Sequence, residues 1–142
     1  MKDNSTGWTK RPNQLGILLD RCVDDRLAHV LAAIPRVKAM TLSDAYGREA
    51  ALTVPDEVFL AEAGGQGWIV WTQNFCMWRV SAERQAIVDH GTKVFSLASA
   101  QHTSIGKGLI FGRHLLTIKR RAQRPGACFW RLYADSTKKD LG

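Results

Sequence analysis

Cysteine is scarce in this sequence, and its spacing excludes two common kinds of small protein. The 142 residues contain three cysteines, Cys22, Cys76 and Cys128, which are far apart and form no Cys-x-x-Cys pair. Neither a zinc site nor a disulfide framework is therefore predicted. We expect each cysteine to be a small, buried or half-buried hydrophobic residue. Free thiols fit a reducing cytosol best, which predicts a cytoplasmic protein.

Long apolar runs are also absent. The longest fall well short of the ~20 residues that a membrane-spanning helix requires, so no membrane partner is predicted. Residues 1–14 are polar and lack the apolar segment of a signal peptide, and we expect them to form a flexible arm. With 45% hydrophobic residues, the chain can form one domain, which we place at 15–134, followed by a tail at 135–142.

Acidic residues are rare near the end of the chain. Residues 101–142 hold nine of the 20 Lys and Arg residues but only two of the 13 Asp and Glu residues, so the net charge of +7 arises there. Such a segment is typical of proteins that bind a polyanion, although a solvated helix face has the same composition. The candidate RNA contacts are Lys119, Arg120, Arg121 and Arg124.

The hydrophobic pattern alternates between short strands and helices. Short, mainly apolar runs predict strands at 15–19, 37–42, 68–72, 93–97 and 128–133, of which the first and third are expected to be buried. Helices are predicted at 23–34, from Pro55 to the glycines at 64–67, at 81–90 and at 109–122, with a loop at 44–53. This order predicts an α/β protein with three α/β/α layers and a mostly parallel sheet of about five strands.

Three apolar segments lead directly into oxygen-bearing side chains. Asp20 ends the first predicted strand, Asp56 and Glu57 follow a short Val-Pro segment, and Asn74 closely follows the third strand. Because the carboxyl ends of parallel strands share one edge of the sheet, we expect these side chains to meet there. Such oxygen ligands suit Mg²⁺ or Mn²⁺, with Asp20, Asp56 and Asn74 as metal ligands and Asp20, Asp56 and Glu57 as catalytic candidates.

Each of these residues also has a purely structural interpretation. Asp20 could cap the helix that follows it, and acids in the first turn of a helix, such as Asp56 and Glu57, interact favourably with its dipole. Asn74 alone would be a turn residue. The prediction of a metal site therefore depends on the joint placement of the four residues.

Trp78 differs from the aromatic residues that are expected in the core. Trp78 falls in a polar-flanked loop next to Arg79, whereas Phe59, Trp68 and Trp71 lie on predicted strand or helix faces and are expected in the core. A tryptophan in such a loop could stack on an unpaired RNA base or contact a protein partner. The sequence leaves both roles open.

Four stretches of the chain together resemble a known family. They are Ile17-Leu-Leu-Asp-Arg21, Leu42-Ser-Asp-Ala-Tyr46, Val54-Pro-Asp-Glu-Val-Phe-Leu-Ala-Glu-Ala63 and Gly67-Trp-Ile-Val-Trp-Thr-Gln-Asn74. From 15 to about 133 the chain resembles PIN-like domains, specifically the VapC-type toxins of bacterial toxin–antitoxin pairs. In that family an Asp ends the first strand, Pro-Asp-Glu opens the second helix and Thr-x-Asp ends the next strand.

The resemblance implies the toxin of a type II toxin–antitoxin pair, a Mg²⁺- or Mn²⁺-dependent endoribonuclease that cleaves RNA. Its implied partners are a cognate antitoxin protein and the RNA substrate, and such toxins are often homodimers. Carried over by position, Asp20 and Asp56 would be metal ligands, with Glu57 beside them and Asp44 in an outer position.

At one position the chain departs from the family pattern. Asn74 stands where the family has Asp, and a neutral amide oxygen brings no charge to a metal and cannot act as a base. This departure leaves open a PIN-like module that binds a partner protein or RNA without cleaving it. A receiver-like signalling domain is a third possibility, but Asn74 stands where its acceptor Asp would be expected.

Overall fold

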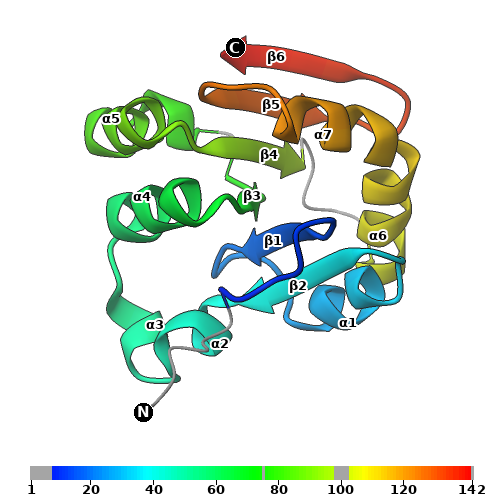
Figure 1. The fold of residues 1–142 in the computed structure, drawn as a ribbon, viewed down its shortest axis with the longest axis horizontal. Coiled ribbons are helices and arrows are strands. Elements are labelled where there is room, and N and C mark those ends of the chain that lie inside the picture. Colours follow the sequence, from blue (N-terminus) through cyan, green and yellow to red (C-terminus); the bar gives the residue numbers. More distant parts are fainter. Residues whose placement is uncertain (1–7, 75, 98–102, 142) are drawn as a thin grey trace.

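The computed structural model describes residues 8–74, 76–97 and 103–141, which form one six-stranded sheet flanked by helices (Figure 1). The strands are β1 (Leu15–Leu19), β2 (Val37–Thr41), β3 (Ile69–Thr72), β4 (Lys93–Leu97), β5 (Cys128–Leu132) and β6 (Thr137–Leu141). Their order across the sheet is β2-β1-β3-β4-β5-β6. The first five strands are parallel, and β6 pairs antiparallel with β5.

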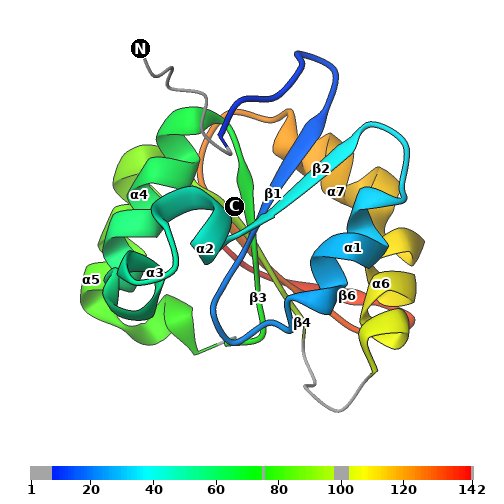
Figure 2. The same cartoon turned by 90° about the horizontal axis from the view of Figure 1, so that it is seen from below.

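Helices cover both faces of the sheet (Figure 2). One layer holds α2 (Leu42–Tyr46), α3 (Ala50–Thr53), α4 (Asp56–Gln66) and α5 (Ser81–His90), and the other holds α1 (Arg26–Ala32), α6 (Ser104–Arg113) and α7 (Leu115–Ala122). A short 3-10 turn, η1 (Met77–Arg79), precedes α5. The predicted α/β/α fold with a mostly parallel sheet is confirmed. None of the helices in the described ranges has the length and apolar character needed to cross a membrane.

Side chains of the strands alternate between two buried cores. On β1, Ile17 and Leu19 face the core under α1 and α6, whereas Leu18 faces the core under α4 and α5. This alternation follows from the two-residue period of a strand. Phe59, Trp68 and Trp71 are all fully buried, as expected.

Several helix boundaries differ from those predicted. Most of the expected loop at 44–53 lies in α2 and α3, and only 47–49 lie between them. The α2 helix begins with a reciprocal capping box, in which the Thr41 and Asp44 side chains each accept a hydrogen bond from the other's backbone N–H. The single helix expected at 109–122 is two helices that meet at His114. This imidazole is buried, and its Nε2 lies 2.7 Å from the Tyr133 carbonyl oxygen beyond β5.

Both ends of the described chain are more ordered than expected. Trp8, in the predicted flexible arm, is buried edge-on against Trp68, whose indole N–H donates to the Trp8 carbonyl oxygen. The expected frayed tail forms β6, where the Asp140 carboxylate accepts two hydrogen bonds of 2.9 Å from Arg131 of β5. A bidentate pair of this kind fixes the register of the added strand.

Candidate active site

Asp20 lies at the carboxyl end of β1, at the edge of the sheet where the sequence places it. Its backbone N–H donates to the Trp71 carbonyl oxygen at 2.9 Å, which continues the β1–β3 pairing by one residue. The side chain is only 4% exposed. The alternative role as a helix cap is excluded, because α1 begins at Arg26 and the residue flanking it is Asp25.

Three neighbours hold the Asp20 carboxylate in one orientation. The Arg21 backbone N–H donates to Oδ1 at 2.7 Å, and the Thr72 hydroxyl donates to Oδ2 at 2.8 Å. The Cys22 thiol lies 3.6 Å from Oδ2. Because burial of a carboxylate is costly without such partners, these contacts allow a nearly buried charge at the edge of the sheet.

Asp56 opens α4 after Pro55 and lies within electrostatic range of Asp20. Burial raises the pKa of the Asp56 carboxyl, the negative charges of Asp20 and Glu57 raise it further, and the Arg21 guanidinium lowers it. That guanidinium lies 3.9 Å from Asp56 Oδ1 and also donates to the Val54 carbonyl oxygen. Arg21 therefore supplies positive charge among the carboxylates.

Glu83 is a fourth acid at this edge, and the sequence analysis missed it. It lies in the first turn of α5, and its pKa is raised by burial and then by the charges of Asp56, Glu57 and Asp20. Its Oε1 atom is buried and has no hydrogen-bond partner within the described part of the chain. The signal was present in the sequence, because the helix that follows the third strand begins at the same edge of the sheet as Asp20.

Asn74 has a structural role in this arrangement. Its side chain is exposed, and its Oδ1 accepts a hydrogen bond of 3.1 Å from the Cys76 backbone N–H. This is the turn interaction typical of Asn. Its backbone N–H donates to the Thr72 hydroxyl, so Asn74 supports the group that orients Asp20.

The predicted RNA-contacting residues lie in two different places. Trp78 lies in η1 just before α5, half-buried against Phe129 with the Arg84 guanidinium 5.8 Å from its ring centroid. The four basic residues occupy the end of α7 and the turn that leads into β5, at the amino edge of the sheet (Figure 2). They are Lys119, Arg120, Arg121 and Arg124. The structure does not bring these four together with the carboxylates.

The donor set fits a divalent cation in its chemistry and charge. All the candidates offer oxygen, which Mg²⁺ and Mn²⁺ prefer, and the buried Oε1 atoms of Glu83 and Gln73 have no partner. Burial and then repulsion between the carboxylates raise the pKa values of Asp56 and Glu83, and a bound cation would offset that repulsion. Among the described His, Cys, Asp and Glu residues, no three are close enough to enclose a metal. The ion would therefore have to draw the carboxylates together.

Comparisons with known proteins agree with this architecture at the level of the family. The family model described as PIN like domain matches residues 16–99, which is more than half of the chain. The matched range includes the four acids at the carboxyl edge of the sheet, Asp20, Asp56, Glu57 and Glu83. No curated protein and no solved structure matches the chain. The chain belongs to the PIN-like domain family, whose fold is of the nuclease type.

Proposed function

We propose that this protein is a Mg²⁺- or Mn²⁺-dependent endoribonuclease and the toxin of a type II toxin–antitoxin pair. The supporting observation is the placement of Asp20, Asp56, Glu57 and Glu83 at the carboxyl edge of the sheet. After burial, the charges of Asp20 and Glu57 raise the pKa values of both Asp56 and Glu83, and the charge of Asp56 also raises that of Glu83. The proposed setting is the cytoplasm, with a cognate antitoxin and RNA as partners and a homodimer as the assembled form.

In this proposal Asp20, Asp56 and Glu83 hold the divalent ion, and Glu57 is close enough to assist. The ion supplies an activated water and stabilises negative charge on the phosphate during cleavage. The protein contributes the orientation of Asp20 through Thr72 and the Arg21 backbone. The Arg21 side chain limits the repulsion among the carboxylates and holds Asp56 beside Val54.

The residues that would contact RNA at this edge differ from the basic residues of α7. Arg21, Arg79 and Arg84 are exposed. Arg21 lies beside Asp56, whereas Arg79 in η1 and Arg84 in α5 lie on either side of the start of the helix that carries Glu83, with Arg84 against Trp78. We propose that these three cations contact the RNA backbone beside the cleavage site and that Trp78 stacks on a base. The basic residues of α7 would then contact only a more distant part of the RNA.

Loss of the Asp20 carboxylate should remove the activity. We expect Asp20→Asn to lower metal-dependent RNA cleavage by about a thousandfold, because a metal contributes several kcal/mol to the barrier. Cleavage of a labelled RNA, with Mg²⁺ or with EDTA, measures this. Asp25→Asn is the matched control, since it removes one exposed charge from a side chain that makes no capping hydrogen bond. Cleavage by Asp20→Asn at the parent rate would contradict the proposal.

The toxin role is tested separately from the chemistry. Expression of the parent chain should arrest growth, and co-expression of the neighbouring gene should relieve the arrest. Asp20→Asn should allow growth without that gene. Arrest that persists in Asp20→Asn would mean that the chain acts without cleaving RNA.

Asn74 favours a second function, a PIN-like module that binds its partner protein or RNA without cleavage. The side chain brings no charge, and its oxygen is already occupied by the turn at Cys76. An Asp can make the same turn, so Asn74→Asp should fold normally. If the parent is a nuclease, Asn74→Asp should keep or increase cleavage, whereas cleavage that appears only in the variant would identify the parent as a binding module.

A further inference from the structure

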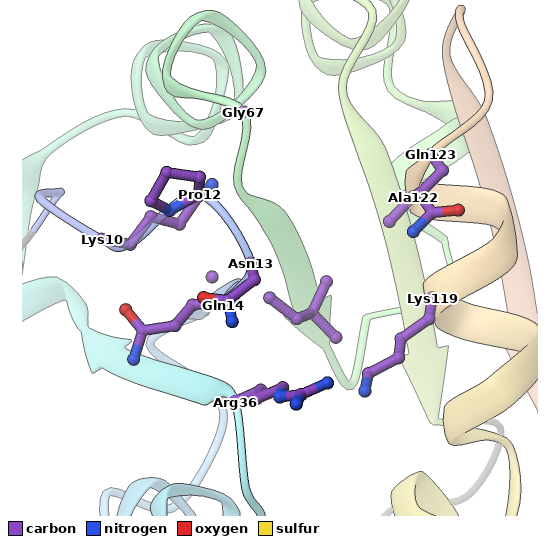
Figure 3. A pocket seen from close by; sticks show the side chains of 11 residues that line it. Lys10, Pro12, Asn13, Gln14, Arg36, Gly67, Lys119, Ala122 and Gln123 are labelled. Carbon is purple, nitrogen blue, oxygen red and sulfur yellow. The ribbon is translucent and has the colours of Figure 1, made fainter.

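A cavity lies at the amino edge of the sheet, at the opposite end of the strands from the carboxylates (Figure 3). It has a volume of about 420 Å³. Its walls are the segment leading into β1, Arg36 just before β2, Gly67 after α4 and the end of α7. Four segments that are distant in the sequence therefore build it.

The charged side chains that line this cavity are all cationic. They are Lys10, Arg36 and Lys119, and none of the acids in the described ranges lines the cavity. In the described part of the chain none of the three forms an ion pair. Figure 3 shows Arg36 and Lys119 extending toward one another from opposite walls. Like charges that face each other repel, and an anion between them would reverse the sign of the interaction.

The backbone at Arg36 supports a role for its side chain. Among the described residues it is the one non-glycine residue with a positive φ, 65°, a conformation that glycine adopts without steric cost. Its carbonyl oxygen accepts a hydrogen bond of 2.8 Å from the Leu15 N–H, which ties this turn to the start of β1. Arg36 therefore places its guanidinium at the cavity although its backbone conformation would favour glycine, and residues in such conformations cluster at functional sites.

Amide side chains complete the lining with hydrogen-bond donors. They are contributed by Asn13, Gln14 and Gln123. The Gln14 Oε1 atom accepts from the Arg11 backbone N–H at 2.8 Å, which leaves the amide NH₂ of Gln14 as a donor. Cations together with neutral donors match the oxygens of a phosphate group.

We propose that this cavity binds a phosphate group carried by a nucleotide-sized ligand, with Arg36 and Lys119 as the principal contacts. The cavity volume lies within the range typical of small-molecule sites, roughly 300–1,000 Å³, and exceeds what a single phosphate fills. Two sources offer this chemistry, a free nucleotide and the terminal phosphate of an RNA chain. The site needs no metal, so it is independent of the carboxylate edge.

Binding is tested by calorimetry in EDTA, which prevents metal-dependent binding at the carboxylates. The probes are inorganic phosphate, AMP, and a short RNA with either a 5′-phosphate or a 5′-hydroxyl. We expect saturable binding that weakens about tenfold or more in Lys119→Gln, because a charge-assisted contact is lost. Arg36→Gly should weaken binding to a similar extent. Because glycine adopts the positive φ at this position without steric cost, weaker binding by this variant would not reflect misfolding.

Lys138→Gln is the matched control, since it makes the same change on exposed β6 at the outer side of the sheet. It should bind like the parent. Tighter binding of AMP than of either RNA would assign the site to a free nucleotide, and a preference for the 5′-phosphorylated RNA would assign it to an RNA end. Absence of saturable binding for all four probes, or equal affinity in the parent, Lys119→Gln and Arg36→Gly, would overturn the proposal.

Discussion

Glu83→Gln is expected to make the protein more stable and, if the proposed nuclease function holds, much less active. The parent places a buried, unpartnered carboxylate oxygen near three other acids, so removal of its charge should raise the free energy of unfolding. We expect the free energy of unfolding to rise by about 0.5–2 kcal/mol, which is typical of single stabilising substitutions. Cleavage should fall about a hundredfold because the metal loses a ligand. Thermal unfolding and RNA cleavage measure the two effects.

The gain in stability should depend on pH in a defined direction. The native pKa of Glu83 is raised above its ordinary value, so the folded protein keeps this proton to a higher pH than the unfolded chain does. The free energy of unfolding of the parent therefore falls as the pH rises through the interval between the two pKa values. Glu83→Gln has no carboxyl group to titrate at this position. The difference in free energy of unfolding between Glu83→Gln and the parent should therefore be largest above that pH interval and should vanish well below it.

Asp89→Asn serves as the control because it removes an acid from the other end of the same helix, where Asp89 is exposed and accepts a hydrogen bond from Gln85. It should retain full cleavage. Added Mg²⁺ should also raise the melting temperature of the parent more than that of Glu83→Gln. Equal Mg²⁺ effects in the two proteins would remove Glu83 from the proposed metal site.

The strands β1, β3, β4 and β5 were predictable because most of their side chains are buried on both faces of the sheet. A continuous run such as Leu15–Leu19 has no other stable place in a small α/β domain, and the alternation with helices then dictates parallel pairing. The expected position of Asp20 at the end of β1 followed from the same reasoning. The α2 helix was missed although Thr41 and Asp44 carry a recognisable capping pattern.

The sequence shows that the end of the chain is positively charged, but it does not show at which edge of the sheet that charge lies in the fold. Lys119 was expected to contact RNA, and the structure places it in a cavity at the edge of the sheet opposite the carboxylates. The reason is the direction of α7, which must return to the amino edge before β5 can begin parallel to β4. The cavity itself could not be foreseen, because its cations come from three segments distant in sequence.

Gly64 should be among the positions where a single added methyl group destabilises the fold most. The glycines at 64 and 65 were expected to end the helix, but both lie inside α4, which ends at Gly67 with a left-handed backbone. A Cβ atom on Gly64 would lie 2.6 Å from the His90 carbonyl oxygen and closer still to the Thr92 hydroxyl. That buried hydroxyl donates to the Leu60 carbonyl oxygen at 2.7 Å.

We expect Gly64→Ala to lower the free energy of unfolding by about 2–4 kcal/mol, since it forces α4 away from the end of α5 and disturbs the Thr92 hydrogen bond. Gly65→Ala, in the same helix, should raise it by about 1 kcal/mol, because its Cβ would meet nothing within 4 Å and alanine favours the helix. Urea unfolding of both variants measures the difference. Stabilisation by both would show that α4 and α5 do not pack this closely, and the placement of Glu83 beside Asp56, which depends on that packing, would then be wrong.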